Sequence, residues 1–300
     1  MTNKNTNENL MVVENVDTAG AITYWRLSGE VSLSKLGLAW TRAGLDGKFL
    51  PETPSDEVAL RRALGAIQSK RRLVRPLARR GVWAIVDEWV DNQTQDLDHR
   101  TLVRVKITKS AGGHETIEVE KVNADWATYN ALHDAIHAEF QRHKGVLAHQ
   151  DISSWLVKLA DKANAVSLRD MGGVYFVPRN KVGFWTTIAD VLAQVDQKVF
   201  RIPAMSNSEA VEAILDAITA EAQREAEALE ADLLKDGDDA LGARALRGRA
   251  NRCDAVKAKV ESYERFLNVK LDDIRAKLDG LRANLSAAAL AATATESDAA

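Results

Sequence analysis

The chain has 300 residues with a formal net charge of −3, 46% hydrophobic and 28% charged residues, and one cysteine. These are ordinary values for a globular protein, and one cysteine excludes a disulfide framework or a cysteine-based zinc site. No apolar run reaches the roughly 18 residues that cross a bilayer and the start of the chain lacks a signal-peptide core, so we expect a cytoplasmic protein.

The pattern along the chain predicts an α+β fold in which an antiparallel sheet is flanked by helices. Both ends lack apolar periodicity, which predicts a flexible N-terminal tail over residues 1–20 and a disordered tail over 286–300. Between them we expect an α+β domain, a winged-helix-like segment and a coiled-coil helical hairpin. Their expected ranges are 21–123, 124–205 and 206–285.

The expected α+β domain opens with two short helices and continues as a β-meander. Leu33, Leu36 and Trp40 have helical spacing, and Thr53-Pro54 is typical of the start of a second helix. The period then changes to two, which indicates strands rich in Val, Ile, Thr and Trp. The expected strands are 72–77, 82–90, 101–109 and 115–122.

The last two strands form the clearest hairpin, because a Gly-Gly pair separates them. If Val105 faces Val119 and Ile107 faces Ile117, then Lys106 faces Glu118 and Arg104 faces Glu120, so that these opposite charges pair. A slip by one residue would place charges opposite apolar side chains. The register is therefore a firm prediction.

The middle segment predicts a helix over 124–143, a second helix capped by Asp151, and a strand over 174–177. The first helix has one apolar stripe at helical spacing. The stripe is Trp126, Tyr129, Leu132, Ile136 and Phe140. This order of elements resembles a winged helix, in which a second helix enters the DNA major groove, although many winged helices contact proteins instead.

The expected hairpin begins with a capping box at Ser206 and Glu209. Residues 209–239 contain eleven acids and two bases, whereas residues 242–282 contain eleven bases and six acids, so the two arms should pair. A two-helix seam buries little surface, so we expect it to bind a partner or to self-associate. Its partner-binding candidates are Val256, Val260, Tyr263, Leu267, Leu271, Ile274, Leu278 and Leu281.

A basic segment without acids offers a candidate surface for nucleic acid, because clustered bases attract phosphates. Its members are Arg61, Arg62, Lys70, Arg71, Arg72, Arg75, Arg79 and Arg80. Trp83 and Trp89 lie nearby and could stack on bases. The alternative is a solvated basic strand that pairs with acids such as Asp87 and Glu88.

His133 and His137 are one helical turn apart in a His-Asp-x-x-His pattern, which is a weak candidate metal site. No other catalytic or nucleotide-binding motif is present in the sequence, and no cofactor is expected. The leading hypothesis is a non-enzymatic interaction or assembly protein that uses the coiled-coil hairpin. The alternatives are a nucleic-acid-binding protein and a metal-dependent hydrolase.

Overall fold

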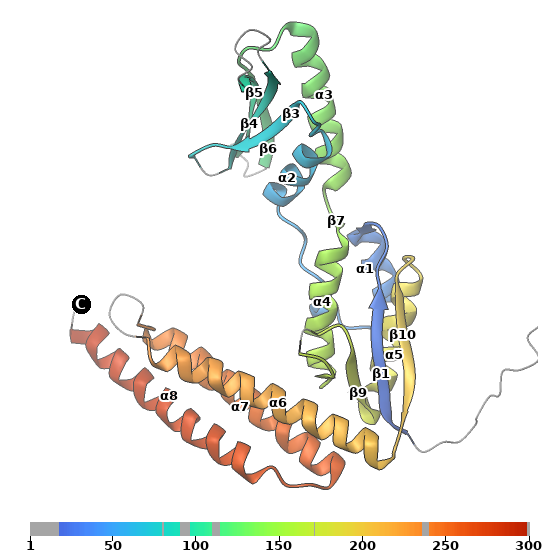
Figure 1. The fold of residues 1–300 in the computed structure, drawn as a ribbon, viewed down its shortest axis with the longest axis vertical. Coiled ribbons are helices and arrows are strands. Elements are labelled where there is room, and N and C mark those ends of the chain that lie inside the picture. The colour runs from blue at the N-terminus through green and yellow to red at the C-terminus, as the bar shows by residue number, and fades with distance from the viewer. Residues whose placement is uncertain are drawn as a thin grey trace, which may run out of the picture. The chain divides into compact units, whose positions relative to one another are not determined.

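The computed structural model describes residues 18–79, 81–90, 97–109, 115–170, 172–235 and 240–298. The chain is an α+β protein with antiparallel sheets, as expected (Figure 1). It divides into two compact units, which we call the inserted unit, residues 27–155, and the bundle unit, residues 1–26 with 156–300. The ranges predicted as 21–123 and 124–205 each contribute to both units. None of the helices among the described residues is long and apolar enough to span a bilayer.

The inserted unit contains four helical segments, the start of a fifth, and two small strands. The helical segments are α1 (Leu33–Arg42), the short 3-10 helix η1 (Gly47–Phe49), α2 (Asp56–Ala66), α3 (Trp126–His143) and the first turns of α4 (His149–Lys162). Strand β2 (Val31–Ser32) pairs with β7 (Val146–Leu147). Helix α2 is capped by Ser55, which accepts a hydrogen bond from the Val58 N–H at 3.4 Å. The predicted start at Thr53-Pro54 is therefore slightly early.

The main sheet of the inserted unit is a four-stranded antiparallel meander. Its strands, in spatial order, are β3 (Arg72–Pro76), β4 (Val82–Val90), β5 (Leu97–Lys109) and β6 (Glu115–Lys121). The predicted hairpin register is confirmed, because Val105 faces Val119 and Lys106 faces Glu118. A register shift between Ile85 and Val86 leaves one extra residue in β5, which bends the ribbon locally.

Helices α2 and α3 pack against one face of this sheet and form its core. The α3 stripe is confirmed for Leu132, Ile136 and Phe140, which are buried in that core. The stripe is wrong at its first member, because Trp126 is 69% exposed. Trp83 is 8% exposed and belongs to the core, so too little of its ring is open for a nucleic-acid base to stack on it.

The sheet of the bundle unit joins distant parts of the chain. Its spatial order is β10 (Lys198–Met205), β1 (Thr18–Arg26), β9 (Tyr175–Pro178) and β8 (Val166–Ser167). The tail predicted over residues 1–20 therefore ends in β1, a strand that the sequence pattern did not predict. The buried Thr23 hydroxyl donates to the Phe200 carbonyl at 2.8 Å and accepts a hydrogen bond from Trp185 Nε1 of helix α5 (Arg179–Ala193) at 2.8 Å. Strand β9, which corresponds to the strand predicted over 174–177, lies between β1 and β8 and so does not form a free wing.

Three long helices complete the bundle unit: α6 (Ser208–Leu233), α7 (Ala243–Leu267) and α8 (Asp272–Asp298). Helices α7 and α8 pack as a hairpin. The predicted single second arm is wrong, because α7 ends at Leu267 and the next residue, Asn268, has a left-handed backbone with φ 53°. The predicted disorder from residue 286 is wrong through Asp298, because the Ala-rich segment continues α8 and buries Ala289. Residues 299 and 300 lie outside the described residues.

Two predicted helix caps are shifted. Asn207, rather than Ser206, caps α6, and its side chain accepts from the Ala210 N–H at 2.8 Å. Asp151 lies inside the first turn of α4 and reaches back to accept from the Ala148 N–H at 2.8 Å. Both carboxamide and carboxylate satisfy backbone donors that have no partner within the helix.

The predicted pairing of oppositely charged helices is confirmed. Arg252 of α7 forms a two-pronged pair with Glu225 of α6 at 2.7 Å for both hydrogen bonds. Lys277 of α8 lies 3.3 Å from Glu230 of α6. These pairs are largely solvated and contribute little energy each, but together they favour one alignment of the helices.

Candidate functional site

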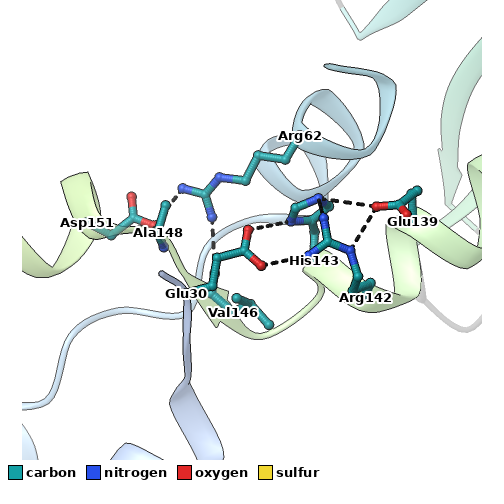
Figure 2. Close-up of polar contacts among 8 residues, drawn as sticks. All are labelled: Glu30, Arg62, Glu139, Arg142, His143, Val146, Ala148 and Asp151. Atoms are coloured by element: carbon teal, nitrogen blue, oxygen red, sulfur yellow. Dashed lines mark hydrogen bonds and ion pairs between the residues drawn. The ribbon is translucent and has the colours of Figure 1, made fainter. Parts of the chain in front are cut away.

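Arg62 is held inside the inserted unit and is not available to a ligand. Figure 2 shows its guanidinium between α2 and the start of α4, where Nη2 lies 2.6 Å from Asp151 Oδ2 and Nη1 donates to the Val146 carbonyl at 3.0 Å. The same Asp151 oxygen accepts the Ala148 N–H. This arginine therefore links three chain segments and is part of the scaffold.

A second polar group in Figure 2 anchors the C-terminal end of α3. Arg142 donates to Glu139 Oε2 and to Glu30 Oε2, both at 2.8 Å, and the bond to Glu139 contributes most to the raised pKa of Arg142. His143 is buried, with Nε2 2.7 Å from Arg142 Nη2 and Nδ1 3.1 Å from Glu30 Oε1 in a poorly directed contact. The charges satisfy one another, which is typical of a structural cluster.

The other basic candidates divide into paired and unpaired residues. Arg72 lies 3.9 Å from Asp87 and Arg75 lies 3.2 Å from Glu88, so the predicted pairing with these acids is confirmed. Four exposed bases have no ion pair within the described part of the chain. They are Arg61, Lys70, Arg71 and Arg79, while Arg80 lies outside that part. Lys70 and Arg71 precede β3 whereas Arg79 follows it, so the eight candidates do not form one continuous strip.

A different surface gathers aromatic and basic side chains, and we call it the tryptophan surface: Trp89, Arg100, Lys121 and Trp126. Trp89 and Trp126 are 40% and 69% exposed. The Arg100 guanidinium lies 5.8 Å from the ring centre of Trp89, and Lys121 Nζ lies 5.1 Å from that of Trp126. These are cation–π contacts, which orient each pair while leaving aromatic area open to solvent.

The fold explains why these residues share one end of the sheet. Strand β4 ends, β5 begins, β6 ends and α3 begins there. Asp125 caps α3 by accepting from the Thr128 N–H at 2.7 Å. That hydrogen bond is the main cause of the lowered pKa of Asp125, and the charge of Arg100 lowers the pKa further. Two exposed apolar residues, Val90 and Leu97, extend this end of the ribbon.

The sequence contained a signal for this surface that the stripe pattern concealed. Trp126 immediately follows the N-cap residue Asp125 and therefore occupies the first helical position. Side chains there lie beyond the part of the helix that packs on the core, so helical spacing alone does not imply burial. Arg100 had no distinguishing local pattern, and only the strand register brings it to Trp89.

The two histidines of the candidate metal site do lie together on α3. Their ring centres are 4.4 Å apart, and His133 Nδ1 lies 3.1 Å from Asp134 Oδ1. Across the residues that the structure describes, no three or more His, Cys, Asp or Glu side chains form a group able to hold a metal ion. A metal at His133 and His137 therefore remains a prediction without a third protein ligand.

The predicted partner-binding residues lie within the bundle itself. Four of them are buried in its core and four are partly buried against it. The buried ones are Val260, Tyr263, Leu278 and Leu281, and the others are Val256, Leu267, Leu271 and Ile274. The Tyr263 hydroxyl donates to the Asn164 carbonyl at 2.7 Å, and burial raises its pKa. A partner would have to open the bundle to reach these side chains.

A groove of about 710 Å³ in the bundle unit contains several titratable groups. The nearly buried Lys259 Nζ lies 2.6 Å from Glu221 Oε1 and 3.3 Å from Asp161 Oδ1. Arg252 and Glu225, which also line the groove, pair with each other. These charged groups are therefore paired with one another. The arrangement resembles a structural network more than a nucleophile with its base.

These features define an α+β protein of two compact units that carries an open aromatic surface. The chain belongs to DUF6744, a family of unknown function, which matches residues 19–296. The match runs from β1 to α8 and so includes both units. No curated protein and no solved structure matches the chain.

Proposed function

We propose that the protein is a non-enzymatic interaction protein and that its tryptophan surface binds a protein partner. The observation that carries this proposal is the exposure of Trp126 and Trp89, each beneath a cation. Exposed tryptophan is costly in water, and Trp and Arg dominate the residues that contribute most to protein interfaces. Val90 and Leu97 add apolar area next to these anchors.

The local charge favours a protein over a nucleic acid. Arg100 lies opposite Asp87 of β4 and shares β5 with Asp98, and Asp125 caps the neighbouring helix α3. The surface therefore has mixed charge. A phosphate backbone favours a surface with a strong excess of positive charge. Nucleic acid is the alternative partner, and it would use Lys70 and Arg71, which lie beside the end of β4 because the Glu88 N–H donates to the Arg71 carbonyl at 2.8 Å.

The test compares partners captured by the full chain and by surface variants. Tagged protein and the variants Trp126→Ala and Trp89→Ala are crosslinked in native cells, and captured proteins are quantified by mass spectrometry. Leu38→Ala is the matched control, because Leu38 is also an exposed apolar residue of the inserted unit. We expect one protein to be lost with both tryptophan variants and retained with the control.

Equal recovery of every protein with all variants would contradict the proposal. A parallel titration uses a labelled single-stranded oligonucleotide at low salt, where phosphate contacts are strongest. Binding that requires Lys70 and Arg71, with no protein lost in the capture experiment, would favour the nucleic-acid alternative.

Assembly through the bundle is a second candidate function, supported by two exposed leucines. Leu234 at the end of α6 and Leu290 of α8 are 82% and 72% exposed. They lie at the same end of the bundle, because Arg247 near the start of α7 donates to Thr293 of α8 at 2.9 Å. Sedimentation should show an oligomer that Leu234→Glu and Leu290→Glu dissociate; a monomer at all concentrations would exclude self-assembly.

A further inference from the structure

A groove runs between α2 and the open edge of the main sheet in the inserted unit. It has a volume of about 580 Å³ and is lined by residues from α2, β3, the following turn and β4. Its apolar wall includes Val74, Leu77 and Trp83. This groove is separate from the tryptophan surface. The groove follows the side and the end of β3, whereas the tryptophan surface lies at the end of β4, which pairs with the start of β3.

Two unpaired arginines lie in this groove. Arg61 projects from α2 and Arg79 from the turn after β3, and both are exposed. Neither has an ion-pair partner within the described ranges, in contrast to Arg62, Arg72 and Arg75. Glu57 is the one acid among the described residues that line the groove, so the charge balance of these residues is positive. Guanidinium groups bind carboxylates with directed, often bidentate hydrogen bonds.

The edge strand β3 also has free backbone groups. The Leu77 N–H donates to the Val82 carbonyl and the Glu88 N–H donates to the Arg71 carbonyl. The odd-numbered residues of β3 therefore direct their backbone N–H and carbonyl groups toward β4. The even-numbered residues direct these backbone groups away from β4, toward the open edge. Arg72 is occupied there by hydrogen bonds with Ser69, and Pro76 has no N–H. Within the described ranges, Val74 is therefore the residue of β3 whose N–H and carbonyl both lack a partner and can pair with an added chain.

We propose that this groove binds an extended acidic peptide. Its backbone pairs with the N–H and carbonyl of Val74, one apolar side chain contacts Trp83 and Leu77, and carboxylates on either side bind Arg61 and Arg79. Adding a strand to a sheet edge is a common mode of peptide recognition, in which backbone hydrogen bonds supply affinity and side-chain pockets supply specificity. Pro76 and the Ser69 bonds restrict the pairing to a short segment.

Fluorescence anisotropy with defined peptides tests this inference on the full chain. The probe is a labelled peptide in which two Glu residues flank one Leu, and the matched probe replaces both Glu with Gln. We expect the Glu peptide to bind at least about tenfold more tightly, because charged hydrogen bonds are stronger than neutral ones. A third probe carries an N-methyl group on the Leu nitrogen, which cannot donate to the Val74 carbonyl, and it should bind more weakly.

Matched variants distinguish the groove from general charge attraction. Arg61→Gln and Arg79→Gln should each weaken the Glu peptide several-fold and leave the Gln peptide unchanged. Arg42→Gln removes an exposed charge from α1 and should have no effect. Circular dichroism confirms that each variant is folded.

Three results would overturn the inference: equal binding of the Glu and Gln peptides, no binding of the Glu peptide at roughly millimolar concentration, or equal losses in the Arg42 control. Binding of a single-stranded oligonucleotide through Arg61 and Arg79 without binding of the peptide would assign the groove to phosphate instead. Because the tryptophan surface is not involved, the Trp126→Ala variant should bind the peptide normally whether or not the proposed function holds.

Discussion

The Arg62 guanidinium lies 2.6 Å from the Asp151 carboxylate, and the two residues are 89 positions apart in the chain. Arg62→Ala should reduce the free energy of unfolding by about 2 kcal/mol, because it leaves a partly buried carboxylate and the Val146 carbonyl without their donor. Urea denaturation followed by tryptophan fluorescence measures the loss. Arg75→Ala, which breaks a more exposed pair with Glu88, should cost less than about 1 kcal/mol. Equal losses would show that the Arg62 pair has no special role.

Lys259 should be important to the bundle because its ammonium is nearly buried between Glu221 and Asp161. Lys259→Met keeps most of the packing volume but leaves Glu221 without its partner, and we expect a loss of about 2 kcal/mol in the free energy of unfolding. The double variant Lys259→Met with Glu221→Leu should recover much of that loss, since neither side chain of this pair is then charged. If the same urea titration showed no loss of stability for Lys259→Met alone, this account would be refuted.

His137 should make the inserted unit less stable in mild acid. Burial first, and the charge of His133 second, lower the pKa of His137 from its ordinary 6.5. Between the lowered pKa and about 6.5 the unfolded chain binds more protons than the folded chain. This contribution to stability is therefore complete above about pH 6.5 and is lost as pH falls through the folded pKa.

The His137 titration can be followed by proton NMR of the imidazole, beside urea denaturation at several pH values. His133→Gln removes the neighbouring charge and should raise the pKa of His137 toward its ordinary value, which makes the decline of stability shallower. A His137 pKa above 6.5 in the folded protein would reverse the sign and contradict the prediction.

Cys253 should react slowly with thiol reagents in the native protein. Its side chain is buried and Sγ donates to the Leu278 carbonyl at 3.3 Å. Burial, followed by the nearby Asp254 carboxylate, raises the pKa of the thiol, so little reactive thiolate forms near neutral pH. Labelling with a coloured disulfide reagent should be at least about a hundredfold faster in denaturant. Comparable native and denatured rates would indicate that the contact between α7 and α8 opens readily.

Asn268 should control the break between α7 and α8. Its left-handed backbone, with φ 53°, suits glycine and asparagine but strains a β-branched residue. Asn268→Val should therefore destabilise the bundle by about 1–2 kcal/mol, whereas Asn268→Gly should be neutral or slightly stabilising. Thermal unfolding followed by circular dichroism compares the variants. The same loss for both substitutions would point to a side-chain contact as the cause.

The sequence predicted the elements whose determinants are local. Alternating apolar residues and matched charges were sufficient for the β5–β6 register, because a one-residue slip exposes every inward side chain. The break at Asn268 was missed because the apolar spacing continues through Leu267 and Leu271 on both sides of it. Asparagine in the left-handed conformation leaves no trace in a hydrophobic pattern.

The candidate site was harder to predict because it depends on which strands become neighbours. The basic segment could be recognised from its sequence alone. The fold, however, pairs Arg62, Arg72 and Arg75 with acidic residues, so these three are not free to bind nucleic acid. Trp126 was assigned to the core from its spacing and is instead exposed. Strand β1 was missed for the same reason, since its partners lie far away in the chain.

Thr23 of β1 and Phe200 of β10 are hydrogen-bonded although 177 positions separate them. During translation, the ribosome therefore releases β1 long before either of its neighbours exists, and all of residues 27–155 emerge in the interval. The inserted unit, being continuous, can fold first, whereas β1 must wait as an unpaired segment. The sheet of the bundle unit can therefore close only after β10 has been synthesised. A nascent chain stalled before β10 would contain a folded inserted unit, while the sheet of the bundle unit would still be incomplete.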